Sequence, residues 1–72
     1  MINLYKELRE ISLFKFNDDT RDTAIKHLMN CQNQFPTYDQ KGQEIIELLQ
    51  KREYETAQKQ LEKNMRSIAK KM

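Results

Sequence analysis

Apolar residues recur mostly three or four positions apart from residue 4 to residue 14, with charged residues between them. This spacing is typical of one face of an amphipathic α-helix. Asn3 is a suitable N-cap for that helix. The polar run of residues 17–20 is expected to end it, and Phe16 should tuck beneath the turn. The apolar positions of this predicted helix are Leu4, Tyr5, Leu8, Ile11 and Phe14.

A second helix is predicted from about Thr20 to Gln32, because apolar residues again gather on one side of the segment. Asp19 or Thr20 is expected to cap its first turn. Pro36 disfavours helical geometry at the residue before it, so the helix should stop near Asn33. The connection to the next helix is therefore short.

A third helix is predicted to begin at Tyr38. Thr37 is followed three positions later by Gln40, which matches a capping box, in which two side chains satisfy free backbone N–H groups at a helix start. Gly42 is expected to weaken the first turns of this helix by roughly 1 kcal/mol relative to alanine.

The hydrophobic phase changes before the last apolar segment, although no Gly or Pro marks a boundary there. At about 100° per residue, five apolar side chains of the last segment fall within roughly 40° of Leu61. They are those of Tyr54, Ala57, Met65, Ile68 and Met72. If the same helix continued back, Ile45 and Leu48 would lie roughly 120–160° from that stripe. We therefore predict a tight turn from Gln50 to Glu53, which lets both apolar sets face one core.

These segments predict one all-α domain over residues 1–72, a small bundle of three to four helices whose last two form an antiparallel hairpin. The competing interpretation is an unbroken helix of about 35 residues from Tyr38 to Met72, buried on two sides in an oligomer, although long helices are uncommon in small domains. A chain of 72 residues has little room for a core. We expect its aromatic residues and methionines to exceed that core, so that a homodimer buries the excess.

The composition agrees with a helical domain and excludes several functional classes. Hydrophobic residues are 38% and charged residues 33%, with one Gly and one Pro, which fits neither a disordered tail nor short strands joined by tight turns. No apolar run is long enough for a membrane span or a signal peptide, so we expect a cytoplasmic protein. The sequence contains no glycine-rich phosphate loop, nucleophile elbow or zinc-ligand spacing. We therefore expect no enzymatic activity, no cofactor and no metal.

Three candidate sites have simple structural interpretations. His27 has no nucleophile or second ligand at a recognisable spacing, so we interpret it as a surface or boundary residue. Cys31 is interpreted as a small core residue. The acidic cluster of Asp18, Asp19 and Asp22 lacks the spacing of a calcium-binding loop, and the positive end of the helix dipole explains acids at a helix start.

Charge is unevenly distributed along the chain. Residues 1–50 carry six Lys/Arg against eight Asp/Glu, a net charge of −2, whereas residues 51–72 carry seven against three, a net charge of +4. Five cations fall roughly 140–200° from Leu61, forming a ridge opposite the apolar stripe. The ridge is interpreted either as a solvated outer face or as a surface that follows phosphates. Its members are Arg52, Lys59, Lys63, Arg66 and Lys70.

Asn64 lies at the edge of the apolar stripe of the last segment. A polar residue there can set the register and partner number of a helical interface. The alternative is that its side chain contacts water, and the sequence leaves both interpretations open.

The stretch from Leu49 to Met65 contains Glu53-Tyr54-Glu55-Thr56-Ala57 followed by Leu61, and it resembles the helix–turn–helix junction of tetratricopeptide repeats. The same region is similar to the last two helices of the effector domain of gluconate-repressor-type regulators, through Ile45, Glu53, Ala57 and Leu61. That family binds a metal through histidines in this region, and this chain has none after His27. We interpret both similarities as a shared way of turning between helices and assign no family.

By elimination, the sequence predicts a small non-enzymatic protein–protein interaction module, regulatory or an assembly adaptor, that docks helix faces onto a partner protein or onto itself. The alternative is a sequence-nonspecific nucleic-acid-binding protein that uses the basic ridge. The sequence does not divide the candidate residues between core and interface. These candidates are Tyr5, Leu8, Tyr54, Leu61, Met65 and Met72.

Overall fold

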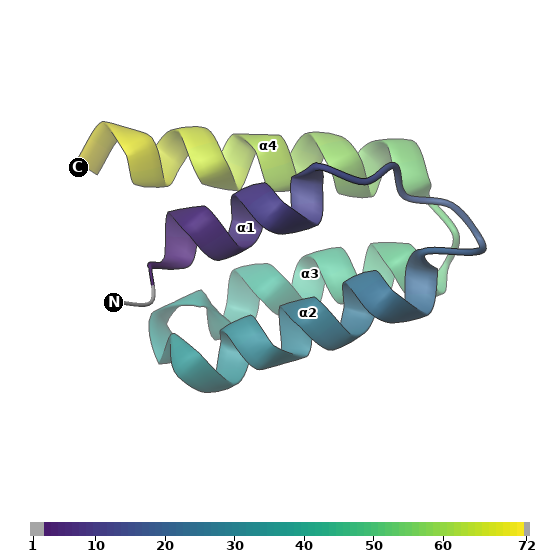
Figure 1. Cartoon of the computed structure of the whole chain (residues 1–72), viewed down its shortest axis with the longest axis horizontal. Coiled ribbons are helices and arrows are strands. Elements are labelled where there is room, and N and C mark those ends of the chain that lie inside the picture. Colours follow the sequence, from purple (N-terminus) through teal and green to yellow (C-terminus); the bar gives the residue numbers. More distant parts are fainter. Residues whose placement is uncertain (1–2, 72) are drawn as a thin grey trace.

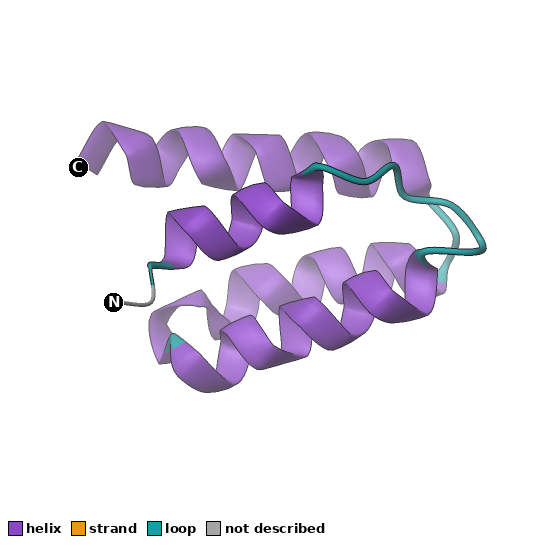
Figure 2. Ribbon diagram, in the orientation of Figure 1, coloured by secondary structure: helices purple, strands orange, loops and turns teal. Residues whose placement is uncertain are grey.

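The computed structural model describes residues 3–71 as an all-α bundle, as the sequence predicted. Within this range the chain forms four α-helices and one short 3-10 helix, with no β-strand (Figures 1 and 2). The elements are α1 (Leu4–Ser12), α2 (Arg21–Gln34), the 3-10 helix η1 (Pro36–Tyr38), α3 (Asp39–Gln50) and α4 (Tyr54–Lys71).

Successive helices run antiparallel, and each packs against two neighbours (Figure 1). α1 contacts α2 and α4, and α3 contacts the same two helices from the other side. The bundle measures 32 × 21 × 20 Å. Its long axis follows α4, whose 18 residues span about 27 Å at 1.5 Å per residue.

The core is built from all four helices. Burying one large aliphatic side chain contributes roughly 1.5–3 kcal/mol, so each such residue matters in a domain of this size. Phe16, in the α1–α2 connection, is also buried, as predicted. The large aliphatic residues that are fully buried are Leu8, Ile11, Leu28, Ile45, Leu49 and Leu61.

α1 begins as predicted but ends two residues earlier. The Asn3 side-chain oxygen accepts hydrogen bonds from the backbone N–H groups of Tyr5 at 2.8 Å and Lys6 at 3.4 Å. The helix ends at Ser12 rather than at the predicted Phe14. The Phe14 ring instead packs edge-to-face against Phe16 and His27, with ring centroids 6.1 and 6.3 Å apart. A contact with α2 therefore takes Phe14 out of the periodic pattern of α1.

Thr20 occupies the N-cap position of α2, as predicted, but its side chain makes no capping hydrogen bond, and Asn17 holds the turn that precedes it. The Asn17 side-chain oxygen accepts from the backbone N–H groups of Asp19 at 2.9 Å and Thr20 at 3.0 Å. The Thr20 hydroxyl donates instead to the Lys15 carbonyl oxygen at 2.8 Å. An Asn side chain can hold a turn in this way by accepting from nearby backbone N–H groups, so the turn before α2 depends on Asn17.

The connection between α2 and α3 also differs from the prediction. α2 continues to Gln34, and Pro36 then starts η1. Thr37 therefore lies inside a 3-10 turn, and no capping box forms with Gln40. The residue before α3 is Tyr38, which makes no side-chain cap. Its ring lies in the core with 2% of its surface exposed. Burial of this ring therefore accounts for the 3-10 turn that replaces the predicted capping box.

Gly42 lets the first turn of α3 approach α2 and the Tyr38 ring closely. A Cβ atom at this position would lie 3.0 Å from the Gln32 side chain and 3.2 Å from two Tyr38 ring carbons. Those contacts are tight, and the buried ring has little freedom to move away.

We therefore expect Gly42→Ala to lower the free energy of unfolding by about 1 kcal/mol, because overcrowding of a packed site outweighs the gain in helix propensity. Urea denaturation followed by circular dichroism measures this change. Lys41→Ala, at the exposed neighbouring position, should stay within about 0.5 kcal/mol of the original chain. A more stable Gly42→Ala variant would show that Tyr38 repacks freely.

The predicted hairpin between α3 and α4 is confirmed, and it excludes an unbroken helix. Arg52 adopts a left-handed backbone conformation with φ of 62°. Its N–H donates to the Leu49 carbonyl oxygen at 3.0 Å, and the Glu53 N–H donates to that of Leu48 at 2.9 Å. This pair of bonds is a Schellman motif, which usually places Gly at the left-handed position. Because no Gly stands at this position, only the change of hydrophobic phase indicated the turn in the sequence.

Arg52→Gly is expected to raise the free energy of unfolding by up to about 1 kcal/mol, because the left-handed conformation costs a non-glycine residue roughly 1–2 kcal/mol and the added chain entropy of Gly offsets only part of that gain. Thermal unfolding measures the effect. Lys51→Gly is the matched control. Lys51 has a φ of −85°, which suits any L-residue, so Gly at this position should lower the free energy of unfolding. Equal destabilisation of both variants would refute the argument.

Candidate functional site

The structure separates the predicted core or interface residues. Leu8 and Leu61 are fully buried in the core, because α1 and α4 pack against each other there, and a partner cannot reach them. Tyr5, Tyr54 and Met65 are half-buried at the surface. Met72 lies outside the described residues.

Little large apolar surface is left exposed in the described part of the chain. Leu13 is 75% exposed and Met29 is 52% exposed, whereas the other large apolar side chains described, apart from the half-buried Tyr5, are buried or packed against the core. The described residues therefore leave less apolar surface for a homodimer to bury than the sequence suggested. Self-association stays a prediction.

Two open hollows lie along the line where α1 packs against α4, and we call this surface the α1–α4 seam. The first hollow is lined by Tyr5, Glu62, Met65, Arg66 and Ala69. The second is lined by Ser12, Leu13, Lys15, Phe16, Tyr54, Glu55 and Gln58.

The spacing of the two hollows follows from the antiparallel packing of α1 and α4. On α1 the two hollows are lined by Tyr5 and Ser12, which are seven residues apart. On α4 the second hollow is lined by residues 54–58 and the first by residues 62–69. Seven residues are two helical turns, or about 10 Å. The seam thus has two hollows with aromatic and aliphatic walls, and side chains two turns apart on one face of an α-helix have a matching spacing.

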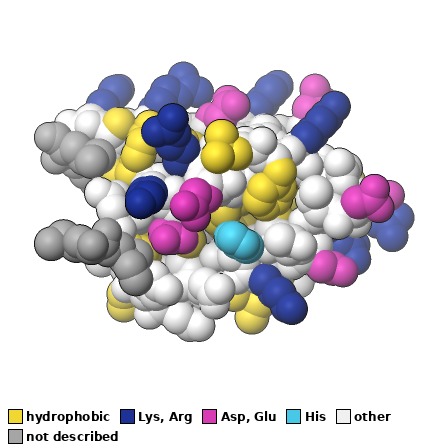
Figure 3. Space-filling view, viewed as in Figure 1, with side chains coloured by type: hydrophobic (Ala, Val, Ile, Leu, Met, Phe, Trp, Pro, Cys, Tyr) yellow, Lys and Arg dark blue, Asp and Glu magenta, His cyan; other side chains and the backbone are white. Residues whose placement is uncertain are grey.

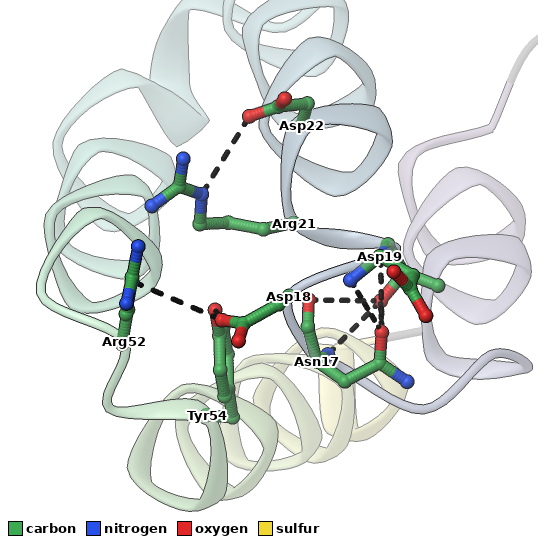
Figure 4. A network of polar contacts seen from close by, with 8 residues as sticks. Asn17, Asp18, Asp19, Arg21, Asp22, Arg52 and Tyr54 are labelled. Carbon is green, nitrogen blue, oxygen red and sulfur yellow. Dashed lines mark hydrogen bonds and ion pairs between the residues drawn. The ribbon is translucent and has the colours of Figure 1, made fainter.

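A polar network joins the α1–α2 connection to the α3–α4 turn (Figure 4). The Tyr54 hydroxyl donates a hydrogen bond to the Asp18 carboxylate, which raises the pKa of Tyr54. Arg52 Nε lies 3.8 Å from the same carboxylate, and Arg21 Nε lies 3.5 Å from Asp22. Most of these charges are exposed, so the ion pairs contribute little to stability. Asp18 and Asp22 therefore contact side chains of this chain, and no group of three or more metal-binding residues occurs within residues 3–71.

His27 and Cys31 lie where the sequence placed them, at the boundary of the bundle and in its core. His27 is half-buried against the Phe14 ring at the surface of the bundle (Figure 3). Cys31 is buried in the core. Burial, together with the nearby Glu7 carboxylate, raises the pKa of the Cys31 thiol to about 11. A thiol with that pKa stays protonated at neutral pH and is a poor nucleophile or metal ligand.

Asn64 forms a buried polar pair that neither interpretation of the sequence included. Its side-chain nitrogen donates a hydrogen bond to the Tyr38 hydroxyl oxygen at 3.0 Å. Asn64 is 4% exposed, so it does not sit in water. Burial raises the pKa of Tyr38 to about 12, while the hydrogen bond from Asn64 acts in the opposite direction. The only signal in the sequence was a polar residue at the edge of an apolar stripe.

The basic ridge consists of four residues rather than five. Arg52 precedes α4 and pairs with Asp18, so it does not share the helical face that the prediction assumed. The ion pairs within the described residues are Arg21–Asp22 and Arg52–Asp18, and neither involves the other four cations. We call these four the cationic stripe: the exposed residues Lys59, Lys63, Arg66 and Lys70.

None of the helices within residues 3–71 combines the length and the apolarity that crossing a membrane requires. The chain matches no protein-family model, no curated protein sequence and no solved structure among those compared with it.

Proposed function

We propose that this protein is a small non-enzymatic interaction module that binds an amphipathic helix of a partner protein along the α1–α4 seam. The observation that supports this proposal is the pair of hollows whose lining residues on α1, Tyr5 and Ser12, lie two helical turns apart. A helix laid along such a groove anchors side chains at positions i and i+7, which are also two turns apart. The proposal places the module in the cytoplasm, as a regulator or assembly adaptor.

Leu13 is the expected anchor of the proposed interface. It is the most exposed large apolar side chain in the described part of the chain, and it lines the second hollow beside Phe16 and Tyr54. Burying a leucine side chain against a partner contributes roughly 1.5–3 kcal/mol. A contact of this size is large enough for a single substitution to abolish a weak complex.

The rim of each hollow carries both signs of charge. Glu62 and Arg66 line the first hollow, and Lys15 and Glu55 line the second. Charged rims set the orientation and specificity of a partner more than its affinity. The expected partner helix therefore has two apolar anchors flanked by charges of both signs.

Leu13→Asp tests the proposal, with Met29→Asp as the matched control. Both positions are exposed, so both variants should fold, but Met29 is on α2 and lines neither hollow. Affinity capture from the source cell with the three chains, followed by mass spectrometry, should recover a partner that Leu13→Asp loses and Met29→Asp keeps. A partner retained by Leu13→Asp, or turnover of a small molecule without any partner, would contradict the proposal.

A second copy of this chain is one candidate for the partner, because two identical seams can pair around a twofold axis. Analytical ultracentrifugation at micromolar concentrations detects this homodimer. Leu13→Asp should shift the dimer to monomer, and Met29→Asp should not. Sedimentation of the unaltered chain as a monomer alone would exclude the second copy and leave a different protein as the partner.

A further inference from the structure

The cationic stripe carries four positive charges along one straight helix face. Its members are spaced by four, three and four residues, which keeps them on the same side of α4. From Lys59 to Lys70 the stripe extends for about 16 Å at 1.5 Å per residue. Figure 3 shows Lys and Arg side chains along the edge of the molecule where α4 lies in Figure 1.

The bundle fixes the direction in which the stripe points. The opposite face of α4 carries Ala57, Leu61 and Asn64, all buried against the rest of the bundle. α4 therefore cannot turn about its axis without exposing the core. The four cations are held outward together, with no carboxylate within ion-pairing distance among the described residues.

The stripe also borders a shallow open hollow. Lys59, Lys63, Arg66 and Lys70 line it together with Glu62 and Ser67. Glu62 is the one carboxylate in this lining, so the hollow has a net formal charge of +3 from four cations and one anion. A chain of phosphates is the simplest ligand that matches a row of cations over this length.

We infer that the cationic stripe binds the phosphodiester backbone of duplex nucleic acid without reading its sequence. The stripe has no Asn, Gln or aromatic side chain to contact base edges or to stack on unpaired bases, so it matches neither sequence-specific nor single-strand binding. An amphipathic helix inserts into a lipid surface through its apolar face, and here that face is buried in the bundle. This inference does not depend on the function proposed above.

The test is a fluorescence anisotropy titration of the full chain against a labelled DNA duplex of about 20 base pairs at two salt concentrations. Four phosphate contacts predict that binding weakens by roughly 100-fold between about 50 and 200 mM salt. Changing the base sequence of the duplex should alter the affinity by less than about 3-fold. No binding at the lower salt concentration would overturn the inference.

Charge reversal locates the binding surface. Lys59→Glu combined with Lys63→Glu should weaken duplex binding by more than about 10-fold at low salt. The matched control is Lys26→Glu combined with Lys41→Glu, which makes the same change in net charge at exposed positions on α2 and α3. Equal weakening by both double variants would mean that overall charge, not the stripe, attracts the duplex, and would overturn the inference.

Two further measurements sharpen the result. Glu62→Gln removes the one carboxylate from the lining of the hollow beside the stripe and should tighten binding by roughly 2- to 5-fold. Vesicles containing about 30% anionic lipid should compete poorly with the duplex. Stronger binding to the vesicles than to the duplex would assign the stripe to a lipid surface instead.

Lys59 and Lys63 line neither hollow of the seam. Partner capture by the charge-reversed chain therefore tests the proposed function separately from the binding of nucleic acid.

Discussion

Leu61→Ala is expected to lower the free energy of unfolding by about 2–5 kcal/mol, the largest effect of any single substitution considered for this chain. Leu61 is fully buried on the face of α4 that meets the rest of the bundle. Truncating it removes apolar contacts and leaves a cavity that helices fixed by their other contacts close only in part. A domain of 72 residues has a total stability of roughly 4–11 kcal/mol, so this one change removes a large part of it.

Leu13→Ala provides the control, because it makes the same chemical change at a leucine that is 75% exposed. Its effect should stay within about 0.5 kcal/mol. Urea denaturation followed by circular dichroism measures both variants. If Leu61→Ala lowered the free energy of unfolding no more than Leu13→Ala does, Leu61 would not be part of the core and α4 would not pack against the bundle through this face.

The second large effect is a loss of stability at alkaline pH. Burial raises the pKa of the Cys31 thiol from 9.0 to about 11 and that of the Tyr38 hydroxyl from 10.0 to about 12. Above pH 9 the unfolded chain releases the thiol proton while the folded chain keeps it, and above pH 10 the same holds for Tyr38. Because the folded state then binds more protons than the unfolded state, the free energy of unfolding falls as the pH rises.

Each group should remove roughly 2–3 kcal/mol of stability, Cys31 between about pH 9 and 11 and Tyr38 between about pH 10 and 12. Below pH 9 the contribution of both groups is constant. Tyr54 adds to the loss in the same direction, because its hydrogen bond to Asp18 also raises its pKa. Urea denaturation at a series of pH values from neutral to 12 measures the decline.

Two variants assign the alkaline loss to its sources. Cys31→Ala removes the thiol and should flatten the decline that begins near pH 9. Tyr38→Phe should flatten the part above pH 10, although it leaves the buried Asn64 amide without its partner and so lowers stability at neutral pH by about 1–3 kcal/mol. An unchanged pH profile in both variants would show that neither buried group controls alkaline unfolding.

The candidate sites were only partly accessible from the sequence. Periodicity placed the cations of α4 opposite its apolar stripe, which the structure retains for four residues. Arg52 was wrongly included because a helical wheel assumes that the helix continues through the turn. The α1–α4 seam was not visible at all, since its two hollows combine residues that are about 50 positions apart in the chain.

The sequence by itself determined the helical class, the N-cap at Asn3 and the hairpin between α3 and α4. These features depend on neighbouring residues: an N-cap acts within one turn, and a change of hydrophobic phase shows where one helix must stop if both apolar faces are to share a core.

Only the tertiary structure decided which residues of each apolar face are core and which are surface. In the structure Leu61 is buried, whereas Tyr5 lies at the seam. Phe14 lies outside α1 and contacts α2, and Asn64 is hydrogen-bonded to Tyr38. Each of these outcomes depends on the position of a second helix. A sequence pattern gives the face that a helix buries, but the neighbour that covers each position is set by how the helices pack together.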